Sequence, residues 1–325
     1  MNGIRAKLAM AALLATGVGP IFSGSATAQT PTEEQCSLAV VSRLAGNSQN
    51  VCETRVVQDL AKRGHAFEQN QLGIASMLAI GPDYTDKEAL KWFEKAAQKG
   101  YAPAQVNLAV MYANGWGTPV NSGAALNWLH VAANQHFARA YTNIGILYLR
   151  GQGVPQDYAE AFRWSQKGAE ANDSDAQTNL AYMYGNGFGC AQNQAEAAEW
   201  YTKAARSGNP LAQHNLADMY LRGDGASQNA AEAFRLFQKA AEQGHTSARI
   251  MLGSMYAEGI GTKRDLGAAY LWLTAASLSG DLRGRDRLSA LESKLNPAQI
   301  AEAREHARRM QFETGQQLTA RAMAQ

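Results

Sequence analysis

The segment LGSMYAEGIGT at residues 252–262 decides the fold, because close copies of it return along the chain. These copies read LAVMYANGWGT at 108–118, IGILYLRGQGV at 144–154 and LAYMYGNGFGC at 180–190. A tryptophan column recurs every 36 residues, at Trp92, Trp128, Trp164, Trp200, Leu236 and Trp272. A second column is alanine each time, at Ala89, Ala125, Ala161, Ala197, Ala233 and Ala269. The chain therefore holds six 36-residue repeats over 64–279.

Each repeat contains the pattern of two helices. Ala104, Leu108, Met111 and Tyr112 form one apolar stripe at helical spacing, which Gly-Trp-Gly then ends. The second helix opens at a column of good N-cap residues, Thr85, Asn121, Asp157, Asn193, Asn229 and Asp265. Glutamate three positions later, at Glu88, Glu160, Glu196 and Glu232, predicts a capping box in four repeats. The second helix ends at Gly100, His136, Asn172, Gly208, Gly244 and Gly280, where we expect positive φ.

Stacked helix pairs of this kind predict an all-α fold, an α-solenoid that winds as a right-handed superhelix of antiparallel pairs. We expect a capping helix pair at 29–63, with the repeats at 64–279 and capping helices with a tail at 280–325. Asn296 and Pro297 have the residue types of an N-cap and a first helical position. Residues 313–325 are expected to fray. The tryptophan column is expected to lie in the core.

The first 28 residues have the pattern of a secretory signal peptide. Arg5 and Lys7 precede an apolar stretch that is too short to span a membrane, and Ala26-Thr27-Ala28 forms a small-x-small cleavage site. We expect export, to the periplasm or beyond. Cleavage leaves 28 basic against 28 acidic residues, which argues against general attraction to nucleic acid or anionic membrane.

The chain has three cysteines. Cys36 and Cys52 fall in the N-terminal cap, and in an oxidising compartment they could form a disulfide across its helix pair. Cys190 lies in a loop position that carries Thr118, Val154, Ala226 or Thr262 in other repeats. We interpret it as a small, partly buried side chain, with a reactive thiol as the alternative.

The repeat resembles the Sel1-like repeat family, most clearly in LGSMYAEGIG at 252–261 and AAEWYTKAARSG at 197–208. This resemblance implies a TPR-like solenoid and an adaptor or regulator in envelope assembly, exopolysaccharide control, signalling or host contact. One branch, the Helicobacter cysteine-rich proteins, is associated with penicillin binding and carries a cysteine pair in every repeat. This chain has one such pair, and that difference weakens the transfer of this function.

The sequence contains no convincing catalytic motif. The Ser-x-x-Lys, Gly-x-Ser-x-Gly and His-Glu-x-x-His patterns are absent, and the Gly-x-Gly loops follow helices rather than the strands of a nucleotide site. Three histidines, His65, His136 and His245, fall at turns between repeats. We therefore predict no enzyme activity, no cofactor and no metal.

Three columns of the first helix vary between repeats. They read Val106, Thr142, Thr178, His214 and Ile250, then Val110, Ile146, Tyr182, Asp218 and Ser254, then Asn114, Arg150, Asn186, Arg222 and Glu258. First helices line the concave binding face of helix-pair solenoids. These columns are therefore either unconstrained surface or a groove for a peptide or partner helix. The groove candidates are Thr142, Arg150, Thr178, Tyr182, His214, Asp218 and Arg222, with Trp116 and Phe188 on the loop rim.

The sequence thus predicts a non-enzymatic, monomeric exported scaffold. Its groove would bind a protein or peptide partner in cell-envelope regulation or assembly. The alternatives are a β-lactam or muropeptide binder or hydrolase like the cysteine-rich branch, and a glycan-binding module that uses the loop aromatics.

Overall fold

The computed structural model describes residues 51–78, 85–281 and 283–323, and it is helical throughout these ranges apart from turns and loops. The predicted signal peptide, the first helix of the predicted cap and Cys36 lie outside the described residues. The described helices form two compact units. The first contains the residues up to Ala171 and those from Gln316 onward, the second is Asn172–Gly315, and each is described on its own. In the part of the chain that is described, no helix has both the length and the apolar character to span a membrane.

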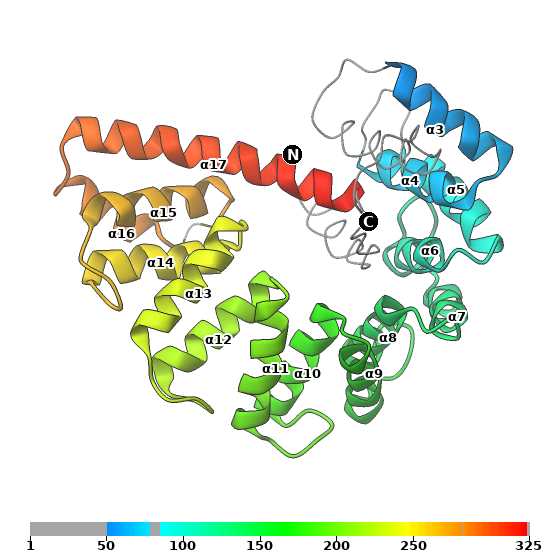
Figure 1. The fold of residues 1–325 in the computed structure, drawn as a ribbon, viewed down its shortest axis with the longest axis horizontal. Helices are drawn as coiled ribbons and strands as arrows, with labels where there is room; N and C mark the ends of the chain where they lie inside the picture. Colours follow the sequence, from blue (N-terminus) through cyan, green and yellow to red (C-terminus); the bar gives the residue numbers. More distant parts are fainter. Residues whose placement is uncertain (1–50, 79–84, 282, 324–325) are drawn as a thin grey trace, which may run out of the picture. The chain divides into compact units, whose positions relative to one another are not determined.

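Each repeat is a first helix followed by a second helix, and the two lie side by side and antiparallel (Figure 1). The first helices are α4 Ala66–Met77, α6 Ala102–Asn114, α8 Ala138–Arg150, α10 Ser174–Asn186, α12 Pro210–Arg222 and α14 Thr246–Glu258. The second helices are α5 Asp86–Gln98, α7 Ser122–Ala133, α9 Tyr158–Glu170, α11 Gln194–Arg206, α13 Ala230–Glu242 and α15 Leu266–Leu278. Before them lies α3 Val51–Arg63, and after them α16 Arg285–Glu292 and α17 Pro297–Met323.

The predicted N-caps of all six second helices are confirmed. In each, the cap side chain accepts a hydrogen bond from a backbone N–H of the first turn. The predicted capping box is wrong in its second half for Glu160, Glu196 and Glu232, because the N–H of the cap residue does not bond to the glutamate. Glu88, Glu160 and Glu232 bond to a lysine or arginine one turn later. In five repeats the cap N–H instead donates to a carbonyl of the first helix, as Asn229 does to Tyr220 at 2.9 Å.

The two glycines of each loop serve different purposes. The first, such as Gly223 at φ +78°, ends the first helix in the left-handed conformation. The second lies against the backbone where the preceding repeat's second helix begins. A Cβ on Gly225 would collide with the carbonyl of Gln194, and one on Gly261 with that of Ala230. Positive φ at His136 (59°) and Asn172 (62°) confirms the expected turns at the ends of the second helices.

Replacing Gly225 by alanine should destabilise the protein much more than the same change at Gly208. Both have positive φ, which costs an L-residue about 1–2 kcal/mol. A Cβ on Gly208 meets nothing within 4 Å, whereas the contact at Gly225 adds about 1–3 kcal/mol of overpacking. Urea unfolding followed by circular dichroism would measure both. Equal losses would show that the loop does not need this close approach.

The tryptophan column does not form the innermost core. Trp92, Trp128, Trp164 and Trp200 are half-buried, although Trp272 is buried. A lysine one turn later covers the ring in three repeats, with Lys203 Nζ 3.7 Å from the centre of Trp200. The fully enclosed column is one residue further on, at Phe93, Leu129, Ser165, Tyr201, Phe237 and Leu273. The core column therefore lies one residue after the expected one. The tryptophan rings lie nearer the surface, where lysine methylene groups cover them and solvent reaches them.

A column of long polar side chains joins consecutive repeats, and it was not predicted from the sequence. From the first helix, Gln69, Gln105, Tyr141, Gln213 and Arg249 each donate to the carbonyl oxygen eight residues earlier, at 2.9–3.2 Å. That carbonyl belongs to the last turn of the preceding second helix, where intrahelical partners run out. Gln105 and Gln213 also accept from Gln135 and Gln243 at the end of their own repeat. We call this column the clasp.

In the last repeat the clasp residue is Arg249, which is 1% exposed. Its guanidinium donates to the carbonyls of Ala241 and Ala275 and to the hydroxyls of Ser279 and Thr314. These oxygens come from the ends of α13 and α15, where the helix dipole is negative, and from α17. Arg249 therefore fixes the C-terminal helix to the last repeat.

Arg249→Met should lower the free energy of unfolding by about 2–3 kcal/mol, because four oxygens lose a charged donor. Arg249→Gln should cost less, since glutamine at the same place in α12 still reaches its carbonyl. Urea midpoints and hydrogen exchange of the α17 amides would test this. A methionine variant as stable as the original would show that the free energy of desolvating the Arg249 guanidinium equals the stabilisation from its hydrogen bonds.

The C-terminal helix begins as predicted. Asn296 Oδ1 accepts from the Gln299 N–H at 2.9 Å, and Gln299 Oε1 accepts from the Asn296 N–H at 3.1 Å. This reciprocal pair precedes Pro297 at the first helical position. The expectation that residues 313–325 fray is wrong in part, because α17 continues to Met323.

Candidate functional site

The expected outward direction of the groove candidates holds for some columns and fails for others. Thr142 and Thr178 are each 3% exposed, so the prediction that they face a groove is wrong. Each hydroxyl donates to the carbonyl four residues earlier in its own helix, which lets the methyl group pack inward. The exposed stripe lies one column further round the first helix.

In the second compact unit this stripe carries Tyr182 on α10 and Leu211, Asn215, Asp218 and Arg222 on α12. We call these five residues the first-helix face. The four on α12 are spaced 4, 3 and 4 residues apart, and they therefore share one side of the helix. Tyr182 and Leu211 are 44% and 46% exposed, so both offer apolar surface to a partner. Leu211 and Asn215 were not predicted from the sequence. The Asn215 column is asparagine in four of the six repeats, so it does not stand out, whereas the Leu211 column differs in every repeat and its variation was a signal that could have found it.

Tyr182 and α12 are linked through a residue that lies beneath them. Tyr201 on α11 is buried, and its hydroxyl is hydrogen-bonded to Asn215. Burial raises the pKa of Tyr201 to about 12, with the nearby Tyr182 hydroxyl adding to the rise and Asn215 opposing it. The buried Tyr201 hydroxyl therefore joins α11 to Asn215 of the first-helix face, with the Tyr182 hydroxyl nearby.

His214, Asp218 and Arg222 follow one another along α12 at four-residue steps. Asp218 lies between the other two, 3.9 Å from His214 Nε2 and 3.7 Å from the Arg222 guanidinium. Burial raises the pKa of Asp218, and Arg222 opposes this rise. Arg222 remains exposed, and so does Arg150 at the corresponding end of α8 in the first compact unit. Arg150 and Arg222 thus have the exposure that the groove hypothesis requires.

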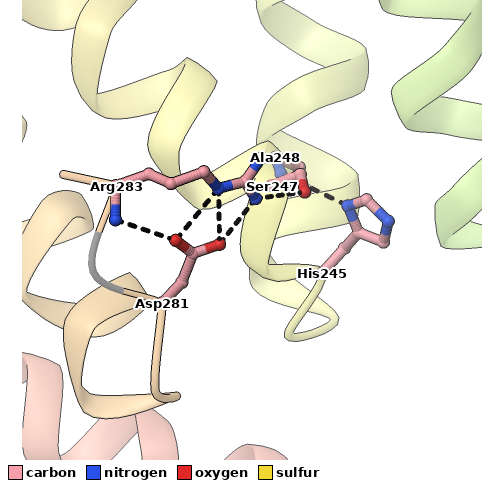
Figure 2. A network of polar contacts seen from close by, with 5 residues as sticks. All are labelled: His245, Ser247, Ala248, Asp281 and Arg283. Carbon is pink, nitrogen blue, oxygen red and sulfur yellow. Dashed lines mark hydrogen bonds and ion pairs between the residues drawn. The ribbon is translucent and has the colours of Figure 1, made fainter.

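Beneath this face, His214 meets His245, with ring centroids 4.8 Å apart. His245 caps α14 by accepting the Ala248 N–H at Nδ1, which requires an uncharged imidazole. Figure 2 shows this cap beside a second polar group, in which the Arg283 guanidinium binds both Asp281 oxygens and the Ser247 hydroxyl. Burial lowers the pKa of His214 to about 4, with Arg283 adding to the effect.

Acid should destabilise the protein through this histidine pair. Burial, with His214 adding to it, lowers the pKa of His245 to about 4, so the unfolded chain binds more protons between pH 4 and 6.5. Stability is therefore full above pH 6.5 and falls as the pH drops to 4, by on the order of 3 kcal/mol for each histidine. The raised pKa of Asp218 acts in the opposite direction.

Urea unfolding at several pH values would measure this slope. His245→Asn should flatten it while keeping the helix cap, because asparagine at the equivalent Asn209 caps α12. His306→Asn, at an exposed position of α17, serves as the control with an unchanged profile. A His245→Asn profile identical to that of the original protein would contradict the assignment.

The loop aromatics are half-buried. Trp116 packs against the core of α4, α5 and α6, and Phe188 lies beside Tyr182 with ring centroids 5.7 Å apart. Trp116 therefore contributes packing within the first unit. Phe188 extends the first-helix face at the end of α10.

Within the described residues, no group of three or more His, Cys, Asp or Glu side chains is placed to hold a metal ion. Cys190 is unpaired and half-buried, and its thiol points to the Met183 carbonyl at 3.7 Å. Burial raises the pKa of Cys190, which disfavours the reactive thiolate. The Cys36–Cys52 disulfide falls outside the described residues and stays a prediction.

Six consecutive segments match the Sel1 repeat, at 69–101, 102–137, 138–173, 174–209, 210–245 and 246–281. The chain belongs to the Sel1 repeat family. Proteins with Sel1 repeats are typically protein-interaction scaffolds. This supports the coarse part of the functional prediction and leaves the partner open. Comparison with the curated proteins gives no match.

Solved structures agree with this assignment. A protective antigen of uropathogenic Escherichia coli, with an SLR fold, is 30% identical over 86% of this chain, with a TM-score of 0.60. This chain spans 64% of that protein's length. A Sel1 repeat protein of Oxalobacter formigenes is 27% identical, with 74% of this chain and 96% of that one covered and a TM-score of 0.61. A Pseudomonas aeruginosa immunity protein, 16% identical over 77% of this chain and 83% of that one, shares the fold at a TM-score of 0.50.

Proposed function

We propose that this protein is a monomeric, non-enzymatic scaffold, exported to the periplasm or secreted. It binds a protein partner through the first-helix face of its second compact unit and serves cell-envelope regulation or assembly. The observation that carries the proposal is the exposure of Tyr182 and Leu211 beside the charged pair of Asp218 and Arg222. Export is supported by the N-terminal charge and apolar pattern of residues 1–28.

The location of the exposed apolar groups favours the second unit. The large hydrophobic residues that are exposed among the described ones are Val120, Val131, Tyr158, Tyr182, Leu211 and Ile260. Only Tyr182 and Leu211 of these lie on first helices, and both belong to the second unit. An exposed apolar group on the binding side of a solenoid loses water when a partner docks, which favours association.

The composition of the face favours a protein partner. Tyrosine and arginine are enriched where proteins bind one another, because each combines a large contact area with polar groups at its end. The first-helix face contains Tyr182 and Arg222, and Asp218, one turn before Arg222 on α12, provides charge of the opposite sign. The balanced charge of the chain without residues 1–28 offers no general attraction to nucleic acid.

Arg222→Ala should weaken partner binding at least tenfold while stability changes by less than about 1 kcal/mol. Arg222 is 69% exposed and its pairing with Asp218 is long, so the pair contributes little to folding. Calorimetric titration with the partner and thermal unfolding would test the two halves. A large loss of melting temperature would show that Arg222 supports the fold.

The partner is to be identified by photocrosslinking in the native envelope. A benzophenone amino acid at Tyr182 should capture one dominant protein, and the same group at the exposed Val131 on a second helix should not. The capture should be lost when Arg222→Ala is added. Equal capture at both positions would refute the face assignment.

The purified protein should hydrolyse a β-lactam no faster than buffer, because the proposed scaffold is not an enzyme.

A further inference from the structure

One position of the second helix differs from its equivalents in size. The column reads Leu90, Leu126, Phe162, Ala198, Phe234 and Tyr270. Five of the six side chains are large, and Ala198 on α11 is the exception. Its methyl group therefore leaves open a volume that a leucine, phenylalanine or tyrosine fills in the other repeats.

The next repeat shows what occupies this volume when a ring is present. Phe234 on α13 packs edge-to-face on Tyr256 of α14, with ring centroids 5.1 Å apart and planes at 85°. This is a favourable arrangement for two aromatic rings. Tyr220 on α12 is the equivalent of Tyr256, 22 residues after Ala198 just as Tyr256 is 22 residues after Phe234. Ala198 cannot provide the ring that would meet Tyr220.

A cleft lies at this place, with a volume of about 320 Å³. Ala198, Leu216, Tyr220 and Ala226 provide its apolar lining. All of its lining residues belong to the second compact unit, and none belongs to the first-helix face. We call it the Ala198 cleft. Its volume is near the lower end of that seen for small binding sites.

The rim of the Ala198 cleft has an excess of positive charge. Lys203 and Arg206 line it together with a single carboxylate, Glu199. Lys203 is held by its contact with Trp200, and its side chain remains exposed. The Arg206 column reads Gln98, Asn134, Glu170, Arg206, Glu242 and Leu278, so the arginine is particular to this repeat. Two departures from the repeat pattern, a lost large side chain and a gained cation, thus coincide at one cleft.

We propose that the Ala198 cleft binds a linear segment of another protein through an aromatic side chain followed by acidic residues. The aromatic ring takes the place of the missing side chain and lies edge-on to Tyr220, as Phe234 lies on Tyr256. The acidic residues pair with Lys203 and Arg206 at the rim. This site is separate from the first-helix face, so either could exist without the other.

The test titrates the full chain with the peptide acetyl-Gly-Phe-Asp-Asp-Gly-amide. Binding is monitored through the NMR signals of the Ala198 and Ala226 methyl groups. The peptide should bind saturably and shift both signals. Replacing its phenylalanine by alanine should lower the affinity at least about tenfold, because the buried ring provides most of the apolar contact. Replacing both aspartates by lysine should abolish binding at low salt.

Ala198→Phe is the decisive variant, since it copies the neighbouring repeat. It should fold with an equal or higher melting temperature and bind the peptide at least about tenfold more weakly, because its own ring fills the cleft. Ala231→Phe, which adds the same ring at an exposed position of α13, should bind like the original protein. Lys203→Glu with Arg206→Glu should weaken the aspartate peptide and strengthen the lysine peptide.

The proposal is overturned if the original chain shows no saturable binding, or if Ala198→Phe binds as well as the original. It is also overturned if Ala198→Phe is strongly destabilised, because the cleft would then lack the shape of a ring. Sedimentation of the original chain and of Ala198→Phe would determine the oligomeric state of each. If the original chain is a dimer and Ala198→Phe a monomer, the occupant is a second copy of this chain and the peptide proposal fails.

Discussion

The approach of one loop backbone to the helix of the preceding repeat is the constraint on which the rest of this structure depends. At Gly225 and Gly261 the loop lies so close to the first turn of that helix that no side chain fits between them. This contact sets the distance between consecutive helix pairs. The clasp then acts at the opposite end of the same second helix, where Gln213 binds the carbonyl of Ala205. The second helices α5, α7, α11 and α13 are thus each held at both ends by the repeat that follows.

Much of the fold could be predicted from the sequence, because local chemistry determines it. The N-cap residues, the left-handed turns at His136 and Asn172 and the start of α17 at Pro297 all depend on neighbours within a few residues. The core column was misplaced because helical spacing alone cannot separate a fully enclosed position from its neighbour. Trp200 is large and apolar, yet Lys203 covers it at the surface while Tyr201 is enclosed. The role of the clasp glutamines depends on a carbonyl in another helix, which no local pattern reveals.

The candidate site was less predictable, for a related reason. Variation between repeats marks positions where the fold sets no common requirement, but such positions can still be buried, as Thr142 and Thr178 show. Threonine satisfies its hydroxyl within its own helix, so a polar residue type does not imply exposure. Tyr182, Asp218 and Arg222 were predicted because their columns vary, and in the structure Tyr182 and Arg222 are exposed while Asp218 is half-buried. Leu211 was not predicted, although its column also varies. The Ala198 cleft is different, because it appears when the repeats are compared and the structure then shows what the missing side chain would touch.

The clasp has a consequence for how such a chain can change in length. Every clasp bond links a side chain to a carbonyl eight residues away, across the turn between one repeat and the next. The partner is a backbone oxygen, so it is the same whichever side chains the preceding repeat carries. A block of 36 residues could therefore be duplicated or lost by recombination, and the new junction would still find its hydrogen bond. Only the end of the array is fixed, because Arg249 also needs the hydroxyls of Ser279 and Thr314. The array can thus grow or shrink inside while its C-terminal closure is inherited unchanged.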